Sequence, residues 1–141
     1  MPLSGIKLVG PHNLENIVAA VTVAKLAGVH DTAIRHVLET FGGVEHRLQH
    51  VLTDNGVVFY NDSKATDIEA TQTALNSFHQ PTIWLAGGLD RGDDLMRLLP
   101  NLSHVKAVIA FGETQQKIVA VARAANKPVI TVDDVEQAVP V

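Results

Sequence analysis

Residues 60–67 read YNDSKATD and lie between an apolar run that predicts a strand and a periodic run that predicts a helix. Within it, residues 62–66 place an acid, two hydroxyls and a lysine in one strand-to-helix turn. In an open α/β sheet such a turn lies at the carboxyl end of a strand, where these folds bind ligands. A helix N-terminus there offers free backbone N–H groups and a partial positive charge, which suit phosphate or carboxylate. We therefore expect this turn to form the mouth of a ligand site.

Strand and helix signals alternate after this turn. Strands are expected at 82–86, 106–111 and 128–132, and helices at 67–78, 95–102 and 113–125, with a last helix capped by Asp133 or Asp134. Alternation at this spacing implies right-handed βαβ crossovers and a parallel sheet. Before the turn, the runs 49–53 and 57–60 flank Asp54-Asn55-Gly56, which is a strong hairpin signal. The sequence thus predicts an α/β, Rossmann-like fold with a mostly parallel sheet and an antiparallel hairpin at its edge.

The first 43 residues do not show this alternation of strands and helices. We expect a short strand at 6–9, a helix that begins near Asn13 as N-cap, and a second helix capped by Asp31 and ended by Gly42-Gly43. One strand and two helices are too little for an independent sheet domain. We therefore place a domain boundary between residues 43 and 44 and interpret 1–43 as the end of a larger domain, whose exposed apolar side chains would favour self-association.

Composition excludes several classes of protein. The 141 residues are 46% hydrophobic and 18% charged with a net charge of −4, so the chain has material for a core and no basic face for nucleic acid. It has no cysteine, which excludes disulfides and thiolate metal sites. No apolar run reaches the roughly 18 residues of a membrane helix, and the start does not resemble a signal peptide. A cytoplasmic location is the expectation.

The turn itself has two interpretations. Asp62 would accept hydrogen bonds from ribose hydroxyls and Lys64 would meet a phosphate. The alternative is that Asp62 and Ser63 only cap the following helix while Lys64 is solvated, which is common at such turns.

Three further candidates lie elsewhere in the chain. Asn13 and Asn16 bring two amides to a helix start, and amides recognise base edges, although Asn13 alone also suits an N-cap. Arg47 would reach a phosphate or remain a surface charge. The loop 87–92 (GGLDRG) follows a buried strand, so Arg91 would clamp a carboxylate there, or the loop is only a tight turn.

Two absences limit the chemistry. The seven histidines are scattered without supporting carboxylates, so we predict no metal site. The chain has no G-x-x-x-x-G-K-[ST] motif, so a triphosphate loop would have to come from outside this sequence.

Taken in order, these motifs resemble those of the Mur ligases, which build the peptide stem of bacterial peptidoglycan. The run HNLEN at 12–16 is similar to the H-N-x-x-N of the family's central ATPase domain, and GVEHR at 43–47 is similar to the G-x-x-H-R that opens its C-terminal domain. The turn NDSKAT at 61–66 resembles that of the members that add D-glutamate. The resemblance extends over essentially the whole chain.

The resemblance implies an ATP-dependent amide ligase of cell-wall synthesis, important for cell shape and division. ATP would phosphorylate the carboxylate of UDP-N-acetylmuramoyl-L-alanine, and the amine of D-glutamate would attack the acyl phosphate. Carried over by position, the ATP-binding residues would be Asn13, Asn16, Arg47, Asp62 and Lys64, the last also acting as the catalytic cation near the phosphates. Thr66, Ser63 and Arg91 would bind D-glutamate, with Arg91 where many relatives have lysine.

The sequence also departs from the family. It lacks the UDP-binding domain, the phosphate loop and the Mg²⁺ ligands, so ATP and Mg²⁺ would depend on residues outside these 141. It also lacks the closing segment of the amino acid pocket. We therefore expect 1–43 to be the end of the central ATPase domain and 44–141 a truncated C-terminal domain, without ligase activity alone. The remaining alternatives are a fragment of another Mur or folylpolyglutamate-type ligase and a non-catalytic Rossmann-like binding module.

Overall fold

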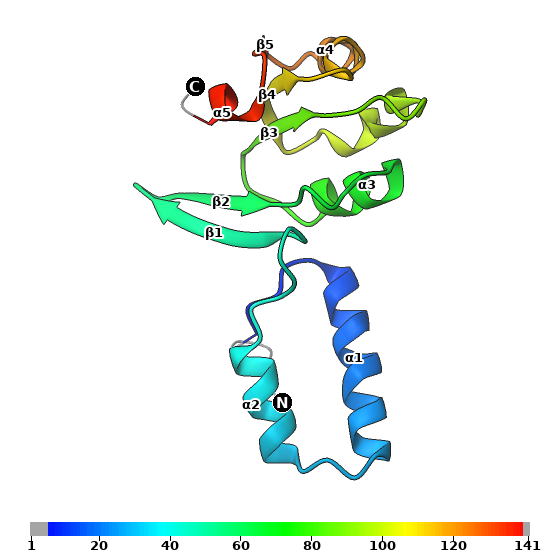
Figure 1. Ribbon diagram of the computed structural model, residues 1–141, viewed down its shortest axis with the longest axis vertical. Coiled ribbons are helices and arrows are strands. Elements are labelled where there is room, and N and C mark those ends of the chain that lie inside the picture. The colour runs from blue at the N-terminus through cyan, green and yellow to red at the C-terminus, as the bar shows by residue number, and fades with distance from the viewer. Residues whose placement is uncertain (1–5, 140–141) are drawn as a thin grey trace. The chain divides into compact units, whose positions relative to one another are not determined.

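The structure, a computed structural model, describes residues 6–139 and divides the chain into two compact units that meet between Ala65 and Thr66. The first unit contains α1, α2, β1 and β2, and the second contains the remaining elements (Figure 1). The predicted α/β fold, with parallel strands and an antiparallel hairpin, is confirmed. No helix among residues 6–139 is long and apolar enough to span a membrane.

The first unit begins with two helices, α1 (Pro11–Leu26) and α2 (Asp31–Thr40). Gly10 rather than Asn13 is the N-cap of α1, because proline at the first helical position is favoured there. His30 is the N-cap of α2, so Asp31 lies in the first turn, where its charge suits the helix dipole. Both predicted N-caps were therefore wrong.

The strand predicted at residues 6–9 is also absent. These residues have no strand assignment, and none of the recorded strand pairings involves them. A strand needs a neighbour to accept its backbone hydrogen bonds, and an apolar run without such a neighbour stays irregular. The run thus leads into α1 without regular secondary structure.

The hairpin forms over the predicted residues, but within residues 6–139 it does not pair with the edge of the parallel sheet as expected. Strands β1 (Gln49–Asp54) and β2 (Val57–Asn61) are antiparallel and pair with each other in a two-stranded sheet of their own. Asn55 and Gly56 between them have φ of 46° and 83°, the left-handed pair that a type I′ turn requires. The ladder places Gln49 opposite Asn61, so the start of β1 and the end of β2 lie side by side.

The second unit is a parallel sheet with helices. Its elements are α3 (Ile68–Asn76), β3 (Thr82–Gly87), the 3₁₀ helix η2 (Leu95–Asn101), β4 (Val105–Phe111), α4 (Gln115–Ala124), β5 (Val129–Thr131) and α5 (Val135–Ala138). The strands lie in the order β3-β4-β5, with β4 in the centre. Val108 and Ala110 of β4 pack with Leu98 of η2 and Val121 of α4 in the buried core. Because β3 and β4 are parallel neighbours, the loops that follow them meet at one edge of the sheet.

Aspartates cap α3 and α5 in this unit. Asp67 accepts a hydrogen bond from the Ala70 N–H at 2.7 Å and begins α3. Asp134 accepts from the Gln137 N–H at 2.9 Å and begins α5, as one of the two predicted residues. The domain boundary expected between residues 43 and 44 stays a prediction.

Candidate functional site

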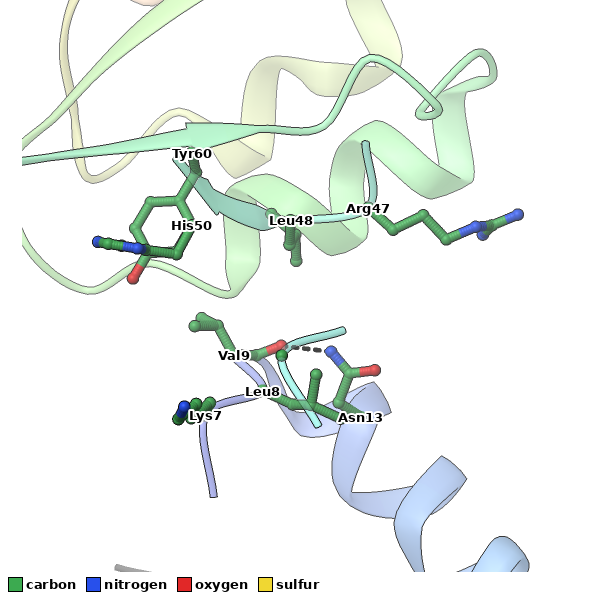
Figure 2. A pocket seen from close by; sticks show the side chains of 9 residues that line it. Lys7, Leu8, Val9, Asn13, Arg47, Leu48, His50 and Tyr60 are labelled. Atoms are coloured by element: carbon green, nitrogen blue, oxygen red, sulfur yellow. Dashed lines mark hydrogen bonds between the residues drawn. The ribbon is translucent and has the colours of Figure 1, made fainter. Parts of the chain in front are cut away.

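A cavity of about 360 Å³ lies within the first unit. It is lined by Lys7, Leu8, Val9, Asn13, Gly42, Arg47, Leu48, His50 and Tyr60. Figure 2 shows Arg47, His50 and Tyr60 on one side, and Asn13 with residues 7–9 on the other. The rings of His50 and Tyr60 meet edge to face with centroids 5.8 Å apart. The cavity therefore combines an aromatic wall, an amide and two cations.

The segment that carries Arg47 into this cavity is strained. His46 and Leu48 have φ of 64° and 42°, a region that residues other than glycine rarely adopt. Such a conformation costs on the order of 1–3 kcal/mol per residue and persists only where its surroundings hold it. Here the strained residues are held by the turn at residues 61–64 that the sequence predicted.

Two hydrogen bonds donated by main-chain N–H groups hold the strained segment against that turn. The Leu48 N–H donates to Asp62 Oδ1 at 2.9 Å, and the Lys64 N–H donates to the His46 carbonyl at 3.1 Å. The turn at 61–64 thus holds residues 46–48 in place. We call the two hydrogen-bonded segments, 46–48 and 61–64, the clamp. Arg47 occupies the centre of the clamped segment.

The side-chain amide of Asn61 uses both its oxygen and its nitrogen to make further hydrogen bonds within the clamp. Its Oδ1 accepts from the Ser63 N–H at 3.0 Å, and its Nδ2 lies 3.1 Å from His46 Nδ1. Sequence reasoning assigned no role to Asn61 or to the His46 ring. The only signal was the asparagine at a turn, since Asn side chains commonly bond to backbone two residues on.

Asp62 is half-buried, and its electrostatics follow from that position. Burial raises the pKa of Asp62, while the Leu48 N–H and the nearby Arg47 and His12 act in the opposite direction. Because Asp67 caps α3, the alternative that Asp62 is the helix cap is not what the structure has. Asp62 instead links the turn to the segment that contains Arg47.

The two predicted amides behave differently. Asn13 lines the cavity and donates from Nδ2 to the Val9 carbonyl at 2.7 Å. Asn16 is exposed, and its Nδ2 lies 3.5 Å from Asn13 Oδ1, at the limit of a hydrogen bond. His12, which sequence reasoning did not single out, has a buried Nδ1 with no hydrogen-bond partner among the described residues. A buried nitrogen without a partner is costly, so it favours a ligand or water at this place.

The remaining predicted residues are exposed. Ser63 and Lys64 contribute backbone to the clamp, and no hydrogen bond or ion pair of either side chain is recorded among residues 6–139. Thr66 and Arg91 belong to the second unit. That they share one site with residues 61–64 stays a prediction. In the described part of the chain, no group of three or more histidine or acidic side chains is arranged to hold a metal ion.

Comparison with known protein families shows to which family the chain belongs. A model described as "Mur ligase, glutamate ligase domain" matches residues 46–141. The chain belongs to the Mur ligase family. The match covers the clamp, the hairpin and the whole second unit, so it includes most of the candidate site residues.

Curated relatives extend the similarity to the N-terminal helices of this Mur ligase chain. Proteins named UDP-N-acetylmuramoylalanine–D-glutamate ligase are 78% identical in Leuconostoc citreum and 58% identical in Geobacillus kaustophilus, each over 141 residues. The matches cover 100% and 99% of this chain but 31% of each relative. The chain therefore spans about a third of the length of these relatives.

Solved structures support the fold. The UDP-N-acetylmuramate–alanine ligase MurC of Thermotoga maritima has a TM-score of 0.75 with 19% identity and covers 96% of this chain and 32% of its own. MurF of Acinetobacter baumannii has a TM-score of 0.62 with 22% identity, covering 96% of this chain and 31% of its own. At such identities the likeness concerns the fold alone.

Proposed function

We propose that this chain is part of an ATP-dependent ligase that joins D-glutamate to UDP-N-acetylmuramoyl-L-alanine in peptidoglycan synthesis. The observation that carries the proposal is the 78% identity over the full 141 residues to a relative with that name. Other Mur and folylpolyglutamate-type ligases share the fold, and the identity favours the D-glutamate-adding member over them. The cytoplasmic location expected from the sequence is part of the proposal.

The first unit supplies the nucleotide side of the site. Asn13 offers an amide to the adenine from the cavity wall, with Asn16 next to it. Arg47 and Asp62, linked by the clamp, grip the ribose and phosphates, and Lys64 brings a cation to the phosphates. The unpartnered His12 Nδ1 supports a ligand beside these groups.

Phosphoryl and acyl transfer gain most from positioning and from cations placed where negative charge develops. The amine of D-glutamate attacks the acyl phosphate, so the two carboxylates of the amino acid must be held while the amine stays free. Ser63, Thr66 and Arg91 are the proposed partners of those carboxylates. A guanidinium suits this role because its fork matches a carboxylate in a bidentate pair.

The part of the chemistry that uses Mg²⁺ is assigned to residues outside this chain. The described residues offer no cluster of metal ligands, and the sequence has no phosphate loop. We therefore expect the isolated chain to release no ADP in the presence of both substrates.

The test uses a full-length ligase that contains this sequence. Phosphate release is measured with UDP-N-acetylmuramoyl-L-alanine and each of D-glutamate, L-glutamate, L-alanine and L-lysine as acceptor. Of the four acceptors, we expect only D-glutamate to support turnover. In Arg47→Met we expect kcat/KM for ATP to fall more than tenfold. The control is Arg97→Met, which removes an arginine whose ion pair to Glu69 (2.8 Å) lies outside the proposed site. Turnover with another acceptor, or ligation by the 141-residue chain alone, would contradict the proposal.

A further inference from the structure

The loop that carries Arg91 has no secondary structure of its own between β3 and η2. Its start is fixed by the neighbouring strand end. The Thr114 N–H donates to the Gly88 carbonyl at 3.2 Å, and a Cβ on Gly112 would come within 2.9 Å of the Gly88 nitrogen. The backbone of the loop therefore lies directly against the segment that leads into α4.

The middle of the loop is held by one lysine of α4. Lys117 Nζ lies 2.8 Å from Asp90 Oδ1 and 3.4 Å from the Asp93 carbonyl oxygen, so it contacts the loop on both sides of Arg91. The Lys117 and Asp90 side chains are 41% and 34% exposed, which makes this pair less exposed than the Arg97–Glu69 pair at 55% and 70%. Partial shielding from water strengthens an ion pair relative to a fully solvated one.

Asp90 has its other contacts nearby. Its N–H donates to Glu113 Oε2 at 3.2 Å, and its Oδ1 also accepts from the Gly92 N–H at 2.9 Å. Asp90 thus closes a small turn around Arg91, and Gly92 supplies the positive φ of 87° that the turn requires. The hydrogen bond and charge of Lys117 lower the pKa of Asp90, so its carboxylate is ionised at neutral pH.

The surroundings of Arg91 are acidic. Asp90, Asp93, Asp94 and Glu113 all lie on this loop or on the segment bonded to it. Arg91 is nevertheless exposed, and no hydrogen bond or ion pair of its guanidinium is recorded among residues 6–139. An adjacent aspartate without a cationic partner would compete for that guanidinium and would repel an acidic ligand.

We infer that Lys117 is a positioning residue for the acidic amino acid substrate: it holds Asp90 and the loop so that the Arg91 guanidinium stays open to a substrate carboxylate. The inference rests on the proposed function, because it deepens the role given there to Arg91. It assigns to a residue of α4, distant in sequence from the loop, a part in amino acid affinity. Lys117 itself contacts the loop and not the substrate.

The experiment measures steady-state kinetics of the full-length ligase with D-glutamate, ATP and UDP-N-acetylmuramoyl-L-alanine varied in turn. We expect Lys117→Met to raise the KM for D-glutamate about 3- to 10-fold, with kcat and the KM for ATP within about twofold of wild type. Lys117→Arg keeps a cation within reach of Asp90 and should restore most of the affinity. Arg97→Met, which removes the other 2.8 Å ion pair of the second unit, should leave the KM for D-glutamate unchanged.

A second variant separates positioning from general stabilisation. Asp90→Asn keeps an oxygen for the Gly92 N–H but cannot compete for Arg91 as an anion. The double variant Asp90→Asn with Lys117→Met should therefore bind D-glutamate better than Lys117→Met alone. Melting temperatures of all variants are compared, because a purely structural Lys117 would lower the melting temperature without changing the KM for D-glutamate.

The outcomes are distinguishable from a failure of the proposed function. If wild-type enzyme does not use D-glutamate, the proposed function fails and this inference fails with it. If wild-type enzyme uses D-glutamate but Lys117→Met has an unchanged KM for it, only the role of Lys117 is overturned. A double variant no better than Lys117→Met would likewise overturn the argument that Asp90 must be kept from Arg91.

Discussion

The bond between Asp62 and the Leu48 N–H provides a direct test of the clamp. In Asp62→Ala the N–H of the half-buried Leu48 loses its acceptor at 2.9 Å. An amide left without its partner costs about 1–3 kcal/mol, and Leu48 already has the unfavourable φ of 42°. We therefore expect residues 46–48 to open locally far more often in this variant.

The assay is amide hydrogen exchange of the 141-residue chain, resolved at Leu48. A cost of about 1–3 kcal/mol corresponds to about 5- to 150-fold faster exchange in Asp62→Ala. Amides of β4 in the core of the second unit serve as the internal control and should exchange at the wild-type rate. Equal Leu48 exchange in wild type and Asp62→Ala would refute the clamp.

Asp62→Asn removes the carboxylate charge but keeps an acceptor for the Leu48 N–H, so it separates the two contributions. The asparagine Oδ1 still accepts from Leu48, so Leu48 exchange should remain near the wild-type rate. Burial raises the pKa of Asp62, so the folded protein binds this proton more tightly than the unfolded chain. Wild-type stability therefore falls as the pH rises from about 4 through the raised pKa, and the cost persists at neutral pH. Asp62→Asn lacks this cost, so its urea midpoint at pH 7 should equal or exceed that of wild type, even though nucleotide binding is weakened.

Two further substitutions test the second unit. Asp67→Ala removes the cap that accepts the Ala70 N–H and should lower stability by about 1 kcal/mol in thermal unfolding, whereas Asp67→Asn should lose little. Gly87→Ala would bring a Cβ within 2.3 Å of Phe111 Cδ2 and 2.5 Å of the Phe111 carbonyl oxygen, so β3 and β4 must separate at their carboxyl ends. We expect a loss of about 2 kcal/mol or more by urea unfolding, against a small change for Gly42→Ala, where nothing lies within 4 Å. A Gly87→Ala protein with the wild-type midpoint would mean that the strand ends are looser than described.

Local sequence signals determined much of the fold. The Asn55-Gly56 turn, the alternation of strands and helices, and Asp134 as a cap were predicted because each depends on residues within a few positions of one another. The family resemblance rested on short motifs of the same kind. These features need no long-range contact, since turn and cap preferences belong to the backbone and the side chain next to it.

The errors at the N-terminus have separate causes. A strand at residues 6–9 depends on a pairing partner that the apolar pattern cannot reveal, and the described residues provide none. The choice between Gly10 and Asn13 as N-cap depended on Pro11, whose preference for the first helical position outweighed the side-chain cap.

The candidate site was half visible in the sequence. Residue types and spacing singled out Asp62, Lys64 and Arg47, but not the clamp that relates them. The bonds from Leu48 to Asp62 and from His46 to Asn61 join positions on opposite sides of the hairpin, which its turn brings together. The same holds for Lys117 and Asp90, which meet because β3 and β4 end side by side. The sequence by itself therefore determined which chemical groups the protein has, and only the tertiary structure decided which of them hold one another, because long-range contacts depend on strand pairing rather than on neighbours along the chain.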